Sequence, residues 1–308
     1  MLVTLACVNF AQAAPLAWIT VQDQGKVSVV DVAKLKVIET ITVAAGPVGV
    51  AVGDGHAFIT HPESGEVTVL NTADYRVQDV WKVGGQPFGI AFSESRNELY
   101  VGDWYGNRVY VVDTRSGDVL ARLKTARSPA GVAINRDSSR LFVANRESDN
   151  VQIFDIAKRR LIKAVPVDDA PFALAVDPAG RRAYCANVQG ASVSVIDAAS
   201  LRRIGTVRTD LDPYGLAVTP DNRTLLVTEQ RAGTVSLIAT ETLREVKSIK
   251  VGSQPDGVAV TSSGKLALVA NWQDGDISII DLIKKTQIER LPVGSGPRAS
   301  HLFLVPGA

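Results

Sequence analysis

Two sets of positions, each recurring about every 42 residues, hold most of the side chains that could do chemistry. Members of the first set directly follow a repeated proline: Val48, Phe88, Ala130, Phe172, Tyr214, Asp256 and Arg298. Members of the second set end a short apolar segment: Val21, His61, Asp103, Asn145, Asn187, Glu229 and Asn271. Aromatic rings stack on flat organic groups, and arginine pairs with carboxylate or phosphate. The first set therefore indicates binding of an organic ligand or a partner chain.

Aromatic and arginine residues also follow the second set within two positions. Exposed aromatics and arginines are the usual anchors of binding surfaces. The residues predicted to bind a ligand are Phe88, Trp104, Tyr105, Arg146, Phe172, Tyr214, Arg231, Asp256, Trp272 and Arg298. In an alternative interpretation, the three aromatic residues that follow a proline only plug the mouth of a channel.

The second set contains an asparagine in three units, where it is expected to bond a turn to itself. His61, Asp103 and Glu229 replace this asparagine in three other units. Oxygen and nitrogen donors of this kind could hold a divalent cation. His301 stands where the six other units carry alanine, and its imidazole could also act as a ligand. The alternative for His301 is that a terminal repeat is atypical.

The elements that must position these residues are repeats. Whole units open at Pro47, Pro87, Pro129, Pro171, Pro213 and Pro255, and a degraded unit opens at Pro297. Each unit reads as four short strands, A to D; in the unit that opens at Pro129 they are expected over 131–134, 140–144, 151–155 and 161–167. Four strands in about 42 residues fit one blade of a β-propeller.

A seventh blade is expected from two distant segments. Residues 16–44 supply strands B, C and D, and residues 298–305 supply an A-like strand. The sequence thus predicts an all-β, seven-bladed β-propeller of four-stranded antiparallel blades, forming a single domain over residues 14–308. The D–A and B–C connections should emerge on one face of the ring, around the central channel, which brings the two sets of residues together.

Several apolar segments resemble YVTN-type β-propeller repeats. They are residues 99–103 (Leu-Tyr-Val-Gly-Asp), 141–145 (Leu-Phe-Val-Ala-Asn) and 267–271 (Ala-Leu-Val-Ala-Asn), each followed by an alternating apolar strand. The resemblance covers residues 16–305 and implies the propeller fold. Relatives in this family include periplasmic propellers similar to a single-stranded-DNA-binding protein and to the haem-binding propeller of nitrite reductases. Two alternatives to a binding protein remain: a metal-assisted hydrolase or lactonase-like enzyme at Asp103, Asn145, Asn187 and Glu229, and a haem-handling protein that uses His61 or His301.

The sequence carries no motif of a common enzyme class. It lacks Gly-x-Ser-x-Gly, His-Glu-x-x-His, Cys-x-x-Cys and a Walker loop. The net charge of +1 provides no general attraction for nucleic acid or anionic membranes. Single-stranded nucleic acid could stack on the aromatic residues, but the carboxylates of Asp103, Glu147, Glu229 and Asp256 would repel it.

The first residues suggest export. Residues 1–10 are mostly apolar, and Ala11-Gln12-Ala13 has the small-x-small form of a signal-peptidase site. This segment is too short to span a bilayer. We therefore expect a signal peptide over residues 1–13 and a periplasmic or secreted, monomeric protein that binds a protein or small organic ligand. An apolar terminus without a targeting role is the alternative.

Overall fold

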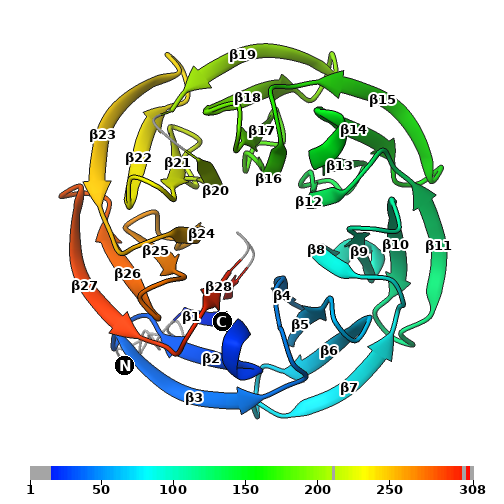
Figure 1. The fold of residues 1–308 in the computed structure, drawn as a ribbon, viewed down its shortest axis with the longest axis horizontal. Helices are drawn as coiled ribbons and strands as arrows, with labels where there is room; N and C mark the ends of the chain where they lie inside the picture. The colour runs from blue at the N-terminus through cyan, green and yellow to red at the C-terminus, as the bar shows by residue number, and fades with distance from the viewer. Residues whose placement is uncertain (1–14, 210–211, 300–302, 306–308) are drawn as a thin grey trace, which may run out of the picture.

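A computed structural model of the protein describes residues 15–209, 212–299 and 303–305. It confirms the predicted all-β fold: seven antiparallel sheets are arranged as blades around a central axis (Figure 1). The blade closed by distant segments is blade 1, and it contains β1 (Leu16–Val21), β2 (Lys26–Asp31), β3 (Lys36–Thr42), β28 (Pro297–Arg298) and β29 (Leu304–Val305).

The six other blades each use four consecutive strands. Blade 2 contains β4 (Val50–Gly53), β5 (His56–His61), β6 (Glu66–Asn71) and β7 (Val77–Lys82), and blade 3 contains β8 (Pro87–Ser93), β9 (Glu98–Asp103), β10 (Arg108–Asp113) and β11 (Val119–Lys124). Blade 4 contains β12 (Pro129–Ile134), β13 (Arg140–Asn145), β14 (Asn150–Asp155) and β15 (Arg160–Pro166), and blade 5 contains β16 (Pro171–Val176), β17 (Arg182–Asn187), β18 (Ser192–Asp197) and β19 (Arg202–Arg208). Blade 6 contains β20 (Pro213–Val218), β21 (Thr224–Glu229), β22 (Thr234–Ala239) and β23 (Arg244–Lys250), and blade 7 contains β24 (Pro255–Val260), β25 (Leu266–Asn271), β26 (Asp276–Asp281) and β27 (Thr286–Pro292).

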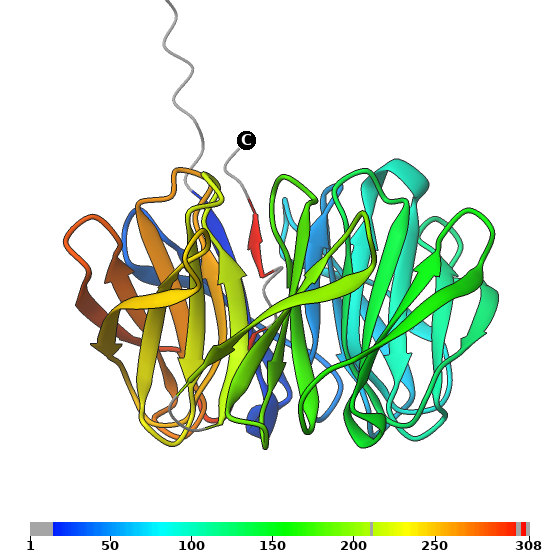
Figure 2. The same ribbon diagram turned by 90° about the horizontal axis from the view of Figure 1, so that it is seen from above.

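In blades 2 to 7 the first strand lines the channel and the last forms the outer rim, whereas in blade 1 β28 takes the inner place and β3 the outer one (Figure 1). Figure 2 shows the strands from the side, running between the two faces of the ring. The start of strand A pairs with the end of strand B, as in Pro129 opposite Asn145. The D–A and B–C connections consequently lie on the same face, which is at the bottom in Figure 2 and is here called the upper face. Among the described residues, helix is limited to three short turns, and none is long and apolar enough to cross a membrane.

Blade 1 closes the ring as the sequence predicts. β1 pairs with β28 through Thr20 and Arg298, and with β29 through Ala17 and Leu304. In Figure 1 the red β28 lies beside the blue β1. The Trp18 main-chain N–H donates to the carbonyl of Phe303 over 2.8 Å. Closure therefore depends on contacts between residues that are nearly the whole chain apart.

The small residue two positions after each proline has a packing role. A Cβ added to Gly131 would lie 2.2 Å from the carbonyl oxygen of Phe172 in the next blade, and one added to Gly257 would lie 1.3 Å from that of Ala299. Real Cβ atoms do not approach other atoms so closely. Adjacent inner strands thus approach each other closely, and glycine permits this approach.

Candidate ligand-binding site

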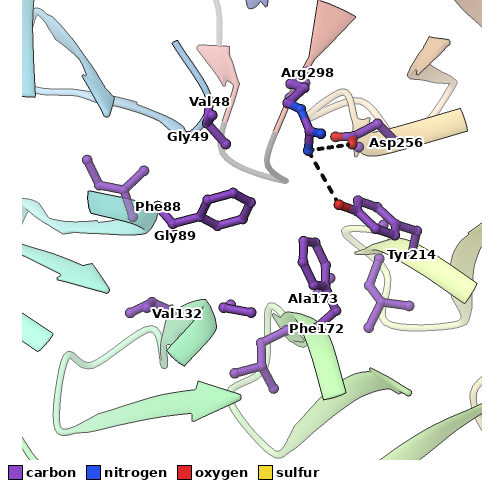
Figure 3. Close-up of a pocket in the computed structure, with 18 of the residues that line it drawn as sticks. Val48, Gly49, Phe88, Gly89, Val132, Phe172, Ala173, Tyr214, Asp256 and Arg298 are labelled. Atoms are coloured by element: carbon purple, nitrogen blue, oxygen red, sulfur yellow. Dashed lines mark hydrogen bonds and ion pairs between the residues drawn. The ribbon is translucent and has the colours of Figure 1, made fainter. Parts of the chain in front are cut away.

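The upper mouth of the central channel contains a small cavity to which every blade contributes. The cavity has a volume of about 90 Å³. Its lining includes all seven residues that follow the repeated prolines: Val48, Phe88, Ala130, Phe172, Tyr214, Asp256 and Arg298. Figure 3 shows the labelled aromatic side chains and Arg298 converging on this space. The first set of sequence positions therefore shares one site, because the blade repeat places each member at the top of an inner strand.

Four aromatic rings form a continuous cluster at the mouth. The ring centroids of Phe172 and Tyr214 are 4.2 Å apart, and those of Phe88 and Phe172 are 5.8 Å apart in an edge-to-face arrangement. Trp104, from the B–C loop of blade 3, lies 4.9 Å from Phe88 by centroid distance. Such tilted pairs are favourable beyond the area they bury. All four side chains are only half-buried, so the rings support one another and still present surface to a ligand.

A polar group occupies the opposite side of the mouth. Arg298 Nη1 lies 3.3 Å from Asp256 Oδ2 and 3.4 Å from the Tyr214 hydroxyl, as the dashed lines in Figure 3 mark. Arg298 Nε donates to Gln22 Oε1 over 2.6 Å. These contacts hold the guanidinium in one orientation. Among the described residues, nothing bonds its Nη2, and the side chain keeps 21% exposure.

Burial and neighbouring charges shift the pKa values of Asp256, Arg298 and Tyr214. Burial raises the pKa of Asp256, and the Arg298 guanidinium offsets only part of that effect. Burial alone would lower the pKa of Arg298, but the Asp256 carboxylate raises it overall. Burial, helped by the charge of Asp256, raises the pKa of Tyr214 to about 12. Tyr214 is therefore a neutral hydrogen-bonding group near neutral pH, and Arg298 stays charged.

Arg146 supplies a second cation at the mouth. It opens the short turn η3 (Arg146–Ser148) in the B–C loop of blade 4. Its guanidinium carbon lies 5.8 Å from the centroid of the Phe172 ring. No carboxylate pairs with Arg146 in the part of the chain that the structure describes. Within the mouth itself, two guanidinium groups stand against the Asp256 carboxylate, which favours an anion there; the charge of Asp23 acts on Arg298 from the side of the neighbouring groove.

Five predicted ligand-binding residues do not line this cavity. Two of them, Trp104 and Arg146, contact the aromatic rings of the mouth, and the other three lie apart from it. Tyr105 is 72% exposed. Arg231 pairs with Asp212 of the preceding loop at 3.0 Å. Trp272 lines a neighbouring groove on the same face, and Arg298 lines both the groove and the cavity.

The asparagines of the second set stabilise their own blades, as the repeat suggested. Asn187 Nδ2 donates to Ser192 Oγ over 3.0 Å and to Ser194 Oγ over 2.9 Å, which joins the B–C turn to strand C. Asn145 and Asn271 make equivalent bonds to the side chains five and seven positions later. All three asparagines are fully buried.

Asp103 and Glu229 bond in the same pattern within their own blades. Asp103 Oδ2 accepts from the Tyr110 hydroxyl over 3.0 Å, and Asp103 Oδ1 accepts two main-chain N–H groups. Glu229 accepts from Thr234 Oγ1 over 3.0 Å and from Ser236 Oγ over 2.9 Å. Each carboxylate thus joins the B–C turn of its blade to strand C, as the asparagines do in their blades.

His61 also bonds to the side chain seven positions later in its own blade. Its Nε2 lies 2.9 Å from Thr68 Oγ1, its side chain is fully buried, and burial lowers its pKa. The structure does not bring His61, Asp103 and Glu229 into one site. Within the described residues, no group of three His, Cys, Asp or Glu side chains could hold a metal ion. His301 lies outside the described residues.

The sequence interpretation missed Gln22, which orients Arg298. Gln22 directly follows Val21, so it occupies the same loop position as Trp104 and Arg146. Reading that position in blade 1 as well as in the other blades would have identified it.

Comparisons with known proteins show the fold and leave the activity open. A family model described as a domain of unknown function (DUF7165) matches residues 84–210, which span blades 3 to 5. No curated protein matches the chain. A functionally unknown protein from Desulfotomaculum acetoxidans is similar in structure, with a TM-score of 0.82 and 14% identity over 93% of this chain and 99% of that chain. Hydrazine synthase from Kuenenia stuttgartiensis is similar with a TM-score of 0.75 and 19% identity, covering 82% of this chain and 88% of that chain.

Proposed function

We propose that the chain is an exported YVTN-type β-propeller that binds a protein or small organic ligand at the upper mouth of its channel. One observation carries the proposal: seven residues, one from each blade, line a single cavity that combines aromatic rings with the Arg298 guanidinium, and Arg146 lies next to it against the Phe172 ring. The ligand expected from this chemistry has a flat or apolar part joined to a carboxylate or phosphate.

The two sides of the mouth would bind different parts of the ligand. The apolar part would lie against Phe88, Trp104 and Phe172, which are partly exposed. The anionic part would meet Arg146 and Arg298, since hydrogen bonds between ions are about twice as strong as neutral ones. The Tyr214 hydroxyl would supply a neutral contact next to the anion.

Binding can be followed through the fluorescence of Trp104 on titration with 3-phenylpropionate and with its amide. We expect the carboxylate to bind about tenfold more tightly than the amide, and Arg146→Ala to remove most of that difference. Arg115→Ala, which removes an exposed arginine from a turn on the opposite face, is the matched control. Equal binding of acid and amide, or an Arg146→Ala variant with unchanged affinity, would contradict the proposal.

Export has a separate test. The full chain with a carboxyl-terminal tag would be expressed in a bacterial host, and the amino terminus of the recovered protein would be sequenced. We expect cleavage after Ala13 and recovery from the periplasm or the medium. An uncleaved cytoplasmic protein would refute the export part of the proposal.

A further inference from the structure

We infer that the ligand is the carboxyl-terminal end of a polypeptide that carries a basic residue a short distance upstream. This inference rests on the proposed function, because it assumes that the mouth binds an organic anion. It adds the class of molecule that presents the anion, and it assigns a role to the groove beside the mouth.

The size of the cavity argues for the end of a longer chain. A volume of about 90 Å³ corresponds to about three water molecules, whereas sites that enclose a small molecule measure about 300–1,000 Å³. The cavity can accept a carboxylate and part of one side chain. A free small molecule would leave most of its surface in water, so further contacts must lie outside the cavity.

The adjoining groove offers those contacts. Its volume is about 700 Å³, and it runs between the B–C and D–A loops of blade 1, the B–C loop of blade 2 and Trp272 of blade 7. Arg298 lines both spaces, so a chain that starts at the mouth can continue into the groove. The exposed amide of Gln24 can bond main-chain groups of an extended peptide.

The groove has the opposite charge to the mouth. Asp23 and Glu63 both line it and are exposed. Ser295 Oγ donates to Asp23 over 2.8 Å, while no cation pairs with Glu63 in the described part of the chain. A lysine or arginine of the ligand would supply the missing partner. The combined site thus recognises an anion at one end and a cation beside it, which matches a peptide terminus with an upstream basic residue.

The experiment uses fluorescence anisotropy with the full chain and pentapeptides labelled at their amino ends. Each peptide ends in phenylalanine and carries one lysine, placed at each upstream position in turn. We expect the free acid to bind about tenfold more tightly than the amidated peptide. At one lysine position we expect a further gain of about fivefold over the peptide without lysine, and replacement of that lysine by glutamate should reverse it.

A charge swap tests the role of the groove. Glu63→Lys should favour the glutamate peptide over the lysine peptide. Glu241→Lys, an equal charge change at an exposed turn on the opposite face, should leave the lysine preference intact. If phenylpropionate binds as tightly as every peptide, or if lysine has no effect at any position, the polypeptide inference is wrong and the proposed function stands. If neither phenylpropionate nor any peptide binds, both are wrong.

Discussion

Removing the Phe303 ring tests whether the contacts of blade 1 hold the propeller closed. Phe303 is fully buried and packs in one cluster with Ala17, Trp18 and Ile19 of β1. The substitution Phe303→Ala deletes the ring and leaves the main-chain carbonyl that accepts from Trp18 N–H. Any loss of stability can therefore be assigned to the packing of this one side chain.

The expected loss follows from the burial. Deleting a fully buried phenylalanine ring costs about 3–5 kcal/mol, because transfer free energy is lost and a cavity remains. The free energy of unfolding should fall by that amount. The Trp18 amide, whose acceptor belongs to Phe303, should exchange with solvent about a hundredfold to a few thousandfold faster, since 1.4 kcal/mol corresponds to a factor of about ten.

Urea denaturation and native-state hydrogen exchange measure the two effects on the same samples. The matched control is Phe142→Ala, which deletes an equally buried ring inside blade 4. Both variants should lose similar global stability, but only Phe303→Ala should expose the amides of β1 preferentially. A variant with wild-type stability, or with exchange raised evenly over all blades, would refute the idea that closure is the local weak point. Deletion of residues 297–308 should open the ring outright and lower its melting temperature.

Three further substitutions test other parts of the structure. Gly257→Ala would place a Cβ 1.3 Å from the carbonyl oxygen of Ala299, so it should lower stability by more than about 3 kcal/mol in a thermal melt; a normal melting temperature would show that the blades can separate there. Burial lowers the pKa of His61, so the unfolded chain binds the proton more readily, and stability should fall below about pH 6.5 by at most about 1.4 kcal/mol per pH unit. His61→Asn should lack this decline in urea titrations at neutral and acidic pH, and an unchanged pH profile would oppose the assignment. Arg298→Gln removes the cation that offsets burial, so the pKa of Asp256 should rise further in a ¹³C NMR titration, and a fall would contradict the ion pair.

The repeat made the blades predictable because the same strand pattern occurs in each unit. In blade 4 the predicted strands 140–144 and 161–167 match β13 (Arg140–Asn145) and β15 (Arg160–Pro166) to within one residue at each end. Closure was also predictable, since the missing strand of the first unit is found at the last one. These features depend on period and on alternation of apolar residues, both of which are visible in the sequence.

Side-chain partners were less predictable because they depend on neighbouring blades. Trp104 and Trp272 occupy the same loop position, yet only Trp104 joins the aromatic cluster. The residue after the proline explains the difference: it is Phe88 in the blade of Trp104 and Asp256 in the blade of Trp272, where no ring is available for stacking. Likewise, the ion pair of Arg298 with Asp256 joins residues 42 positions apart in different blades, and neither residue identifies the other in the sequence.

Arg298 belongs both to the proposed binding site and to β28, and this connects ligand affinity to the integrity of the ring. Its carbonyl accepts from Thr20 Oγ1 over 2.7 Å, while its guanidinium faces the mouth. A ligand that binds only the closed ring stabilises it, by about 2.7 kcal/mol at a concentration a hundred times the Kd. By reciprocity, a change that releases β28 must weaken ligand binding by the same coupling free energy. Bound ligand would therefore stabilise the closed ring. The resistance of the protein to proteolysis should then rise with the fraction of protein that holds ligand.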